Sequence, residues 1–183
     1  GGAPAGPPDA TIDLTTDDGV RLVGGAWRYS DARIVEVAFR AVGEDLRPSG
    51  PPNRTYDIEP RAGAADFDDS AWPVIPATSL AARRANGRLS FNWYRIDVTV
   101  PDRIGGVAPT GATLVFDIVV DDYAEVWVDG VLPRTLGAGN ENLVQGWNAP
   151  NRLVIAREAR PGQRIRLAVF GINSPLSDPP PNY

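Results

Sequence analysis

The chain has 183 residues, of which 43% are hydrophobic and 22% charged, and its 23 acidic and 18 basic residues give a formal charge of −5. Every basic residue is Arg, and the sequence contains no Lys, His, Cys or Met. This composition excludes a Ser-His-Asp triad, a thiolate nucleophile, a lysine Schiff base and an ordinary zinc site, and it leaves carboxylate, hydroxyl and guanidinium chemistry.

Charge and hydropathy also restrict the partners. The basic residues are scattered singly apart from Arg83-Arg84, so the sequence predicts no nucleic-acid partner and no anionic membrane surface. No apolar run approaches the ~20 residues that a membrane-spanning helix needs. The chain begins Gly-Gly-Ala-Pro, which indicates a processed or excised piece. A signal peptide removed upstream would make the protein secreted or periplasmic, but the residues present do not identify the compartment.

The first part of the chain predicts a lead-in and two short strands. Residues 1–10 are rich in Gly, Ala and Pro and predict a flexible lead-in, so that residues 11–183 form a single β-sandwich domain. Thr11–Leu14 and Val20–Val23 are candidate strands on either side of a turn at Asp17-Asp18-Gly19.

A clearer strand is predicted at Ile34–Val42, where apolar and charged residues alternate. The apolar side chains at odd-numbered positions fall on one face, while Glu36 and Arg40 share the other. Residues 43–55 contain three Pro and two Gly and predict a loop, after which Thr55–Ile58 resumes an extended run.

A group of carboxylates follows, and it has two interpretations. Closely spaced Asp66, Asp68 and Asp69 are candidate ligands for a structural calcium ion. An EF-hand loop starting at Asp66 is excluded, because its sixth and twelfth positions are Ala instead of Gly and Glu. The favoured alternative is a turn in which Asp side chains bond to backbone amides, with Trp72 packed beneath it.

The middle of the chain predicts one helix and two long strands. Ser79–Asn86 is the one plausible helix, with Ser79 as its N-cap and Gly87 placed to end it. Ser90–Val100 and Ala112–Val120 alternate apolar and polar residues with period two, which is typical of half-buried strands.

The strongest local signal is a hairpin within Val119–Arg134. Two apolar runs are joined there by Asp129-Gly130, and Asp-Gly favours a type I′ turn because both central residues need positive φ. Alternation in the first run places Val126 on the core face and Trp127 on the other.

The remaining chain predicts a loop and two further strands. Gly137–Pro150 is rich in Gly and Asn and predicts a loop, followed by strands at Leu153–Ala156 and Arg164–Ile172. Eight to ten short strands without βαβ spacing predict an all-β fold, an antiparallel β-sandwich of jelly-roll type with one short helix.

Three motifs, in this order, resemble the galactose-binding-like jelly roll: Phe67–Trp72, Trp93–Pro101 and Asp122–Gly130. In the sugar-binding domain of β-galactosidases and β-glucuronidases, an Asp-Asp-x-x-Trp turn precedes a Tyr-Arg strand ending in Val-Pro and a Val-Trp-Val-Asn-Gly hairpin. Asp129 here replaces the Asn of that hairpin. Gly146–Arg152, Phe170–Pro175 and the ending Pro179–Tyr183 are similar to the bacterial domain that precedes a gluconolactonase-like (regucalcin-type) β-propeller.

These resemblances imply a non-catalytic accessory domain that binds glycans through loops at one rim. They also imply a neighbouring enzyme domain, the propeller, which would carry the catalytic residues. No catalytic residue carries over to this chain. A structural module that docks onto a partner or associates with copies of itself is the alternative, because likeness of fold does not decide function.

A saccharide site needs an aromatic platform and planar polar side chains. The candidates are Trp147, Asn148, Asn173, Asp121 and Asp122, together with Asn92 and Arg95. Trp147 could instead fold back to plug its own loop, and Asn92 and Arg95 could be hydrogen-bonding structure at a strand end. Glycoside hydrolysis by Asp121 or Asp122 with Glu141 or Glu158 is the least favoured alternative, since adjacent Asp residues on a strand point to opposite faces.

Overall fold

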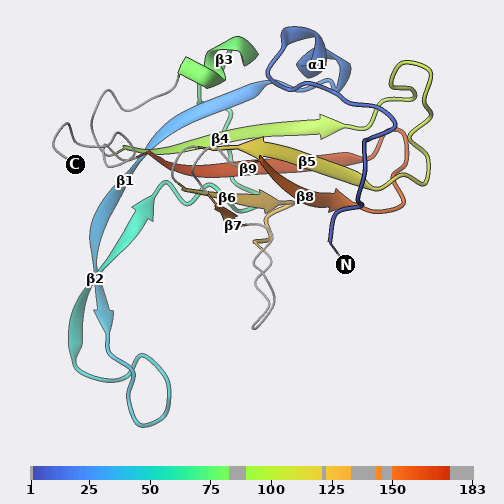
Figure 1. The fold of residues 1–183 in the computed structure, drawn as a ribbon. Coiled ribbons are helices and arrows are strands. Elements are labelled where there is room, and N and C mark those ends of the chain that lie inside the picture. The colour runs from blue at the N-terminus through green and yellow to red at the C-terminus, as the bar shows by residue number, and fades with distance from the viewer. Residues whose placement is uncertain (1, 83–89, 121–122, 133–142, 146–149, 174–183) are drawn as a thin grey trace, which may run out of the picture.

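The two longest strands after residue 89 form the centre of an antiparallel sheet (Figure 1). The computed structural model describes residues 2–82, 90–120, 123–132, 143–145 and 150–173. The elements are α1 (Asp17–Leu22), β1 (Trp27–Arg40), β2 (Pro52–Glu59), β3 (Val74–Ile75), the 3-10 helix η1 (Ala77–Ala82), β4 (Ser90–Thr99), β5 (Leu114–Val119), β6 (Tyr123–Val128), β7 (Leu143–Gln145), β8 (Pro150–Ala156) and β9 (Arg164–Asn173). The described chain is therefore mostly antiparallel β structure, as the sequence predicts.

The strands form a large and a small sheet. The large sheet has the order β2-β1-β4-β9-β6-β7, with β3 also paired to β1, and the small sheet consists of β5 and β8. All the pairings are antiparallel. No helix in the described residues has the length and apolar character needed to cross a bilayer.

The main apolar core lies between the large sheet and the β5–β8 sheet. Ile96 and Val98 of β4 and Leu167 of β9 are buried on this face, as the predicted alternation requires. Phe116 of β5 packs against the same cluster from the opposite layer. Val126 of β6 belongs to an adjoining buried cluster, which confirms its predicted place on the core face.

The opposite face of the large sheet is covered by the segment 60–72, which connects β2 to β3. Trp93 and Phe170 on this face are buried, with Phe67 and Trp72 of the covering segment packed against them. The indole Nε1 of Trp93 donates to the carbonyl of Pro60, 2.8 Å away. The large sheet is thus buried on both faces at its centre.

The predicted Asp129-Gly130 turn is confirmed by its backbone angles. The φ angles are 48° at Asp129 and 82° at Gly130, and the N–H groups of Val128 and Val131 each donate to the other's carbonyl. Asp129 Oδ1 also accepts a hydrogen bond from the N–H of Arg166, at 2.8 Å. The turn therefore continues β6 while being fixed to β9.

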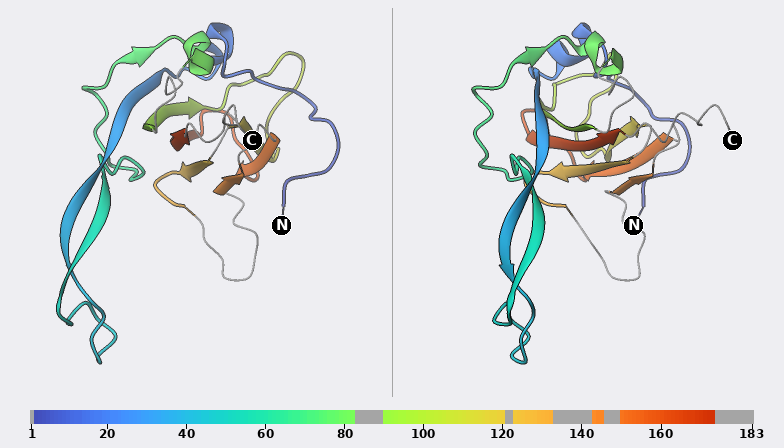
Figure 2. Two further views of the ribbon diagram at one scale, coloured as in Figure 1. Left: turned by 60° about the vertical axis from the view of Figure 1, so that its left-hand side comes forward. Right: turned by 90° about the vertical axis from the view of Figure 1, so that its left-hand side faces the viewer.

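A long β-ribbon projects from the body and is the least expected feature (Figures 1 and 2). The first part of β1 pairs with β3 and β4, and its second part, Arg33–Arg40, pairs with β2 alone. The predicted strand at Ile34–Val42 was therefore too short, since β1 begins at Trp27. The predicted loop at 43–55 is correct only to residue 51, because β2 starts at Pro52.

Three local predictions near the N-terminus and at Ser79 were wrong. The predicted strand Val20–Val23 and the turn before it are instead α1, since the hydroxyl of Thr16 caps the helix by accepting from the N–H of Gly19. Thr11–Leu14 forms no strand. Ser79 lies inside η1 and bonds to the Pro76 carbonyl, so it is no N-cap; residues 83–89 lie outside the described residues.

Candidate functional site

One end of the two sheets brings together the strand ends that flank most of the predicted ligand residues. Ser90 pairs with Asn173, Tyr123 with Ile172 and Gln145, and Val119 with Pro150. We call these strand ends the rim. Three residues separate Val119 from Tyr123 in the sequence and four separate Gln145 from Pro150, so the ends of both sheets lie at the same side of the fold. The topology therefore supports the expectation of a single rim.

Most of the predicted ligand residues at the rim fall outside the part of the chain that the structure describes. These are Asp121, Asp122, Trp147 and Asn148, while Asn173 is described through its backbone alone. Whether Trp147 is a platform or a plug therefore stays a prediction. Asn92 is the one predicted rim residue whose side chain is described.

A cluster of polar side chains lies beside the rim on the inner face of β1 and β4. Asn92 is buried, its Oδ1 lies 2.6 Å from the Tyr29 hydroxyl, and its Nδ2 donates to Ser90 Oγ at 3.2 Å. The same Tyr29 hydroxyl lies 2.5 Å from Oδ1 of Asp31. We call Tyr29, Asp31, Ser90 and Asn92 the rim cluster.

The Tyr29 hydroxyl lies between two oxygen atoms, those of Asp31 and Asn92. A tyrosine hydroxyl carries one proton, so it donates to only one of its two oxygen neighbours. If it donates to the Asp31 carboxylate, turning the Asn92 amide over lets an N–H of Asn92 donate to the tyrosine oxygen. Asp31 itself is exposed, so its second carboxylate oxygen is available to a ligand from solution.

A surface hollow adjoins the rim cluster at the base of the β1–β2 ribbon. Its volume is about 450 Å³ and its lining consists of Asp31, Ala32, Arg33, Glu59 and Pro60. Arg33 Nη2 and Glu59 Oε2 form an exposed ion pair at 2.9 Å across β1 and β2. The lining of the hollow therefore contains two carboxylates and one guanidinium, and Asp31 connects it to the rim cluster.

Sequence reasoning missed the residues of this hollow because it began the strand at Ile34. The preceding Trp27-Arg28-Tyr29 already combines aromatic β-formers, and that signal would have extended β1 to its observed start. The pairing of Arg33 with Glu59 could not be predicted from the sequence, because it depends on the register between β1 and β2.

Arg95, predicted as a ligand residue, lies on the opposite face of β4 from Asn92, because an odd number of positions separates them along the strand. Its side chain is 1% exposed and Nε donates to Asp69 Oδ2 at 2.9 Å. Its other nitrogens donate to the carbonyls of Ala62, Ala64 and Phe67. Arg95 therefore holds segment 60–72 on the sheet, which is the structural alternative that the sequence analysis gave for this residue.

The predicted metal ligands adopt the alternative turn. Asp68 Oδ1 accepts from the Ser70 N–H at 3.0 Å, and hydrogen bonds from Ser70 hold the pKa of Asp68 below its usual value. Asp69 Oδ1 lies 3.7 Å from Arg28 Nε, while its Oδ2 faces Arg95. In the part of the chain that the structure describes, no group of three potential ligands, Asp66 included, is placed to hold a metal ion.

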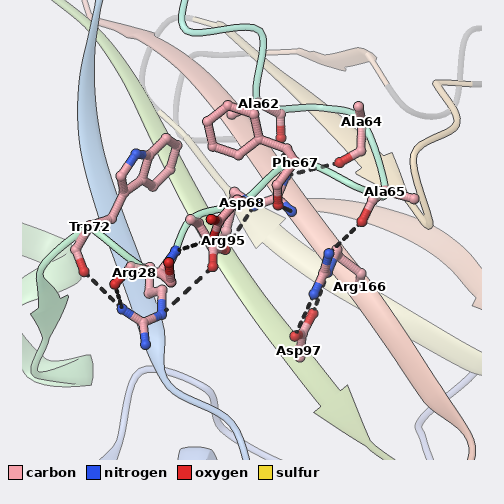
Figure 3. Close-up of polar contacts among 12 residues, drawn as sticks. Arg28, Ala62, Ala64, Ala65, Phe67, Asp68, Trp72, Arg95, Asp97 and Arg166 are labelled. Atoms are coloured by element: carbon pink, nitrogen blue, oxygen red, sulfur yellow. Dashed lines mark hydrogen bonds and ion pairs between the residues drawn. The ribbon is translucent and has the colours of Figure 1, made fainter.

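A second guanidinium, that of Arg166, fixes the same segment farther along the sheet. Nε and Nη2 of Arg166 bond both carboxylate oxygens of Asp97, at 2.7 and 2.9 Å, and Nη1 bonds the carbonyl of Ala65 (Figure 3). The hydrogen bonds from Arg166 hold the pKa of Asp97 below its usual value, and Asp97 raises the pKa of Arg166. These groups stabilise the fold and lie on the face away from the rim cluster.

Only one of the carboxylates considered for hydrolysis lies within the described residues. Glu158 follows Ala156 at the end of β8. Asp121, Asp122 and Glu141 lie outside the described residues, so hydrolysis stays an untested alternative.

Comparisons with known proteins were made on sequence and on structure. No protein-family model matches the sequence, and no curated protein matches it. Among solved structures, the chain is similar to β-glucuronidase from Ruminococcus gnavus, with 14% identity, a TM-score of 0.35, and coverage of 81% of this chain and 22% of that enzyme. The same enzyme in complex with D-glucaro 1,5-lactone gives 15% identity and a TM-score of 0.34, again over 81% of this chain and 22% of that one. The chain thus spans about a fifth of the enzyme, and a likeness at this TM-score carries no argument about function.

Proposed function

We propose that the chain is a non-catalytic accessory domain with a jelly-roll β-sandwich that binds a saccharide at the rim. The observation that carries the proposal is the hollow beside the rim cluster, where Asp31 belongs to both. A saccharide presents hydroxyl groups that both donate and accept, and the carboxylate and guanidinium groups of the lining supply complementary partners. The sequence resemblance to sugar-binding jelly rolls supports the same function.

The charges of the hollow favour a neutral saccharide. Arg33 is already paired with Glu59, and Asp31 adds a second negative charge nearby. A uronic acid would bring its own carboxylate toward two others with only one guanidinium to offset them, which costs free energy. We therefore expect neutral sugars to bind better than uronic acids.

A regucalcin-type propeller as neighbouring domain and a structural calcium ion stay predictions from the sequence.

A glycan array, run with and without calcium and followed by titration calorimetry, tests the proposal. Asp31→Asn should weaken binding of the best neutral glycan at least about tenfold, which corresponds to loss of one charge-assisted hydrogen bond. Asp18→Asn is the matched control, because Asp18 lies on the surface of α1 away from the hollow. Absence of any saccharide binding, or equal binding by both variants, would overturn the rim site.

An assembly module is the second candidate function, and the exposed apolar side chains of the β1–β2 ribbon favour it. The hollow shares only Arg33 and Glu59, at the base of the ribbon, with this surface, so the two functions are tested by separate variants.

A further inference from the structure

The β1–β2 ribbon with its connecting loop, residues 33–59, is called the arm, and it carries much of the exposed apolar surface of the described chain. Of the nine large hydrophobic residues that are exposed in the described residues, five lie on it: Ile34, Phe39, Val42, Leu46 and Tyr56. An isolated two-stranded ribbon is only marginally stable in water, and gathered apolar surface marks interaction sites. Among the described residues, the arm is therefore the strongest candidate for an interaction surface.

One edge of the arm has backbone groups available for another strand. Ala41 donates its N–H to the Pro51 carbonyl and accepts from the Gly50 N–H, so odd-numbered residues of β1 bond toward β2. Because successive residues of a strand bond to opposite edges, the N–H and C=O groups of Ile34, Glu36, Ala38 and Arg40 point away from β2. β4 pairs with that edge only as far as Ala32, and no other described strand follows it.

The two edges of the arm differ in their ability to pair. β2 begins with Pro52 directly after Pro51, and prolines on an edge strand block pairing because they have no N–H. β1 has neither Pro nor Gly along its whole length, Trp27–Arg40. The β1 edge is therefore open over the whole of Arg33–Arg40, whereas prolines block the start of the β2 edge.

We propose that the arm associates with the arm of a second copy, through antiparallel pairing of their β1 edges about a two-fold axis at Ala38. In this register Glu36 of each copy lies opposite Arg40 of the other, so that the interface contains two opposite-charge pairs. On the other face of the strand, Val37 lies opposite Phe39 of the second copy. Opposite-charge and apolar pairs of this kind stabilise adjacent strands.

The charge pattern selects this register over its neighbours. A two-fold axis at Glu36 or at Arg40 would place like charges directly opposite each other, which is destabilising. An axis at Val37 or at Phe39 would place both charges opposite apolar residues. Only the axis at Ala38 places Glu36 and Arg40 opposite a charge of the other sign. Both are also residues whose backbone groups point to the open edge.

The pairing would turn two marginal ribbons into one four-stranded sheet. Its order would be β2-β1 of one copy followed by β1-β2 of the other, and the half-exposed ring of Phe39 would gain a neighbour across the axis. Sheets of three or more strands with an apolar face are independently stable, unlike a single hairpin. Because only one strand edge is involved, the interface is small and a weak dimer is expected.

The first test exchanges charges and measures mass by sedimentation equilibrium of the 183-residue chain. Glu36→Arg and Arg40→Glu alone each create two like-charge pairs per dimer and should weaken association at least about tenfold. An equimolar mixture of these two variants should dimerise again, because each arginine of one variant then faces a glutamate of the other at positions 36 and 40. The recovery excludes misfolding as the cause of the weaker association. The ion pair of Glu36 with Arg54, at 3.4 Å, is exposed and contributes little to the difference between the variants.

The second test uses the absence of Cys from the chain. Ala38→Cys places two thiols across the axis at a Cα separation of about 5.5 Å, within disulfide range, so mild oxidation should give a covalent dimer. Asn53→Cys on β2 is the control, because it lies on the far strand of its own arm and should stay monomeric. Monomeric wild type at the highest soluble concentration, or equal cross-linking by both variants, would overturn the proposal. Neither readout depends on saccharide binding, so this inference and the proposed function fail independently.

Discussion

The buried guanidinium of Arg95 is joined to the carboxylate of Asp69, with Nε 2.9 Å from Oδ2. Arg95 is 1% exposed and contacts the covering segment 60–72, where its remaining nitrogens donate hydrogen bonds to backbone carbonyls. A turn without regular secondary structure is thereby held on the sheet. The Asp-Asp motif and the Tyr-Arg strand, which are separate in sequence, are therefore joined by the ion pair of Asp69 with Arg95.

Replacing Arg95 should be the most damaging change on this face. Arg95→Ala removes a buried guanidinium from its ion pair with the partly buried Asp69 and leaves several carbonyls without donors, so the free energy of unfolding should fall by about 3 kcal/mol or more. Arg95→Lys keeps the charge but not the planar fork and should recover only part of the loss. Denaturant unfolding of both variants measures the difference, and wild-type stability in Arg95→Ala would show that the segment is held by other contacts.

The sequence predicted the central strands and the Asp129-Gly130 turn because their signals are local. Alternation over Ser90–Val100 and the need for positive φ are properties of a few adjacent residues. The sequence left the role of Arg95 open, either as a ligand residue or as hydrogen-bonding structure at a strand end, for the opposite reason. Its partners lie 26 to 33 residues earlier in the chain, and a single sequence does not show which face of the strand a connecting segment will cover.

The helix α1 was missed because its cap was interpreted as a turn. Thr16 followed by two Asp residues is a good helix start, but Gly19 in the first turn pointed to a tight turn instead. The structure explains the Gly: a Cβ there would lie 1.8 Å from the carbonyl oxygen of Asp13. The arm was not predicted, because β2 starts at Pro52, inside the Pro-rich stretch that predicted a loop.

The turn at Gly130 should tolerate no side chain. Gly130→Val should lower the free energy of unfolding by more than ~1 kcal/mol, since a β-branched residue cannot comfortably adopt φ of 82°. The structure adds a steric reason, because a Cβ at Gly130 would lie 2.6 Å from the backbone nitrogen of Ala65. An unchanged melting temperature would mean that the turn rearranges without cost.

A matched pair of variants separates the cost of a positive φ angle from the cost of a steric clash at the Cβ position. Gly162 has the same φ of 82° but open space around its Cβ position. Gly162→Ala should therefore lose only the cost of the positive φ, about 1 kcal/mol, while Gly130→Ala loses more. Equal losses in thermal melts would show that backbone strain alone decides both positions.

The ion pair of Asp97 with Arg166 should make stability depend on pH in the acid range. Hydrogen bonds from Arg166 lower the pKa of folded Asp97, so the unfolded chain binds the proton more readily. The stabilisation is therefore complete above the ordinary carboxyl pKa of about 4 and is lost as the pH falls through the lower folded pKa. Asp97→Asn should be less stable than wild type at pH 7, with the difference shrinking below about pH 4. A difference that stays constant from pH 7 to pH 2 would contradict this assignment.

Trp127 and Trp147 should respond differently to removal of their rings. The Trp127 ring packs beneath segment 60–72, since a Cβ at Gly63 would lie 2.5 Å from its Cδ2, and its buried Nε1 has no acceptor in the described residues. Trp127→Ala should cost ~3 kcal/mol or more. Trp127→Phe should cost much less, because it keeps most of the packing and removes the unsatisfied donor.

Trp147→Ala distinguishes a binding platform from a plug. If the ring faces solvent at the rim, its loss should abolish saccharide binding and change stability little, because its area contributes to the ligand contact and not to the core. If the ring fills its own loop, the loss should approach that of Trp127→Ala. Calorimetric binding and thermal melts on the same variants decide between these outcomes. A large stability loss at Trp147 in a protein that binds no saccharide would leave association through the arm as the function that the chain supports.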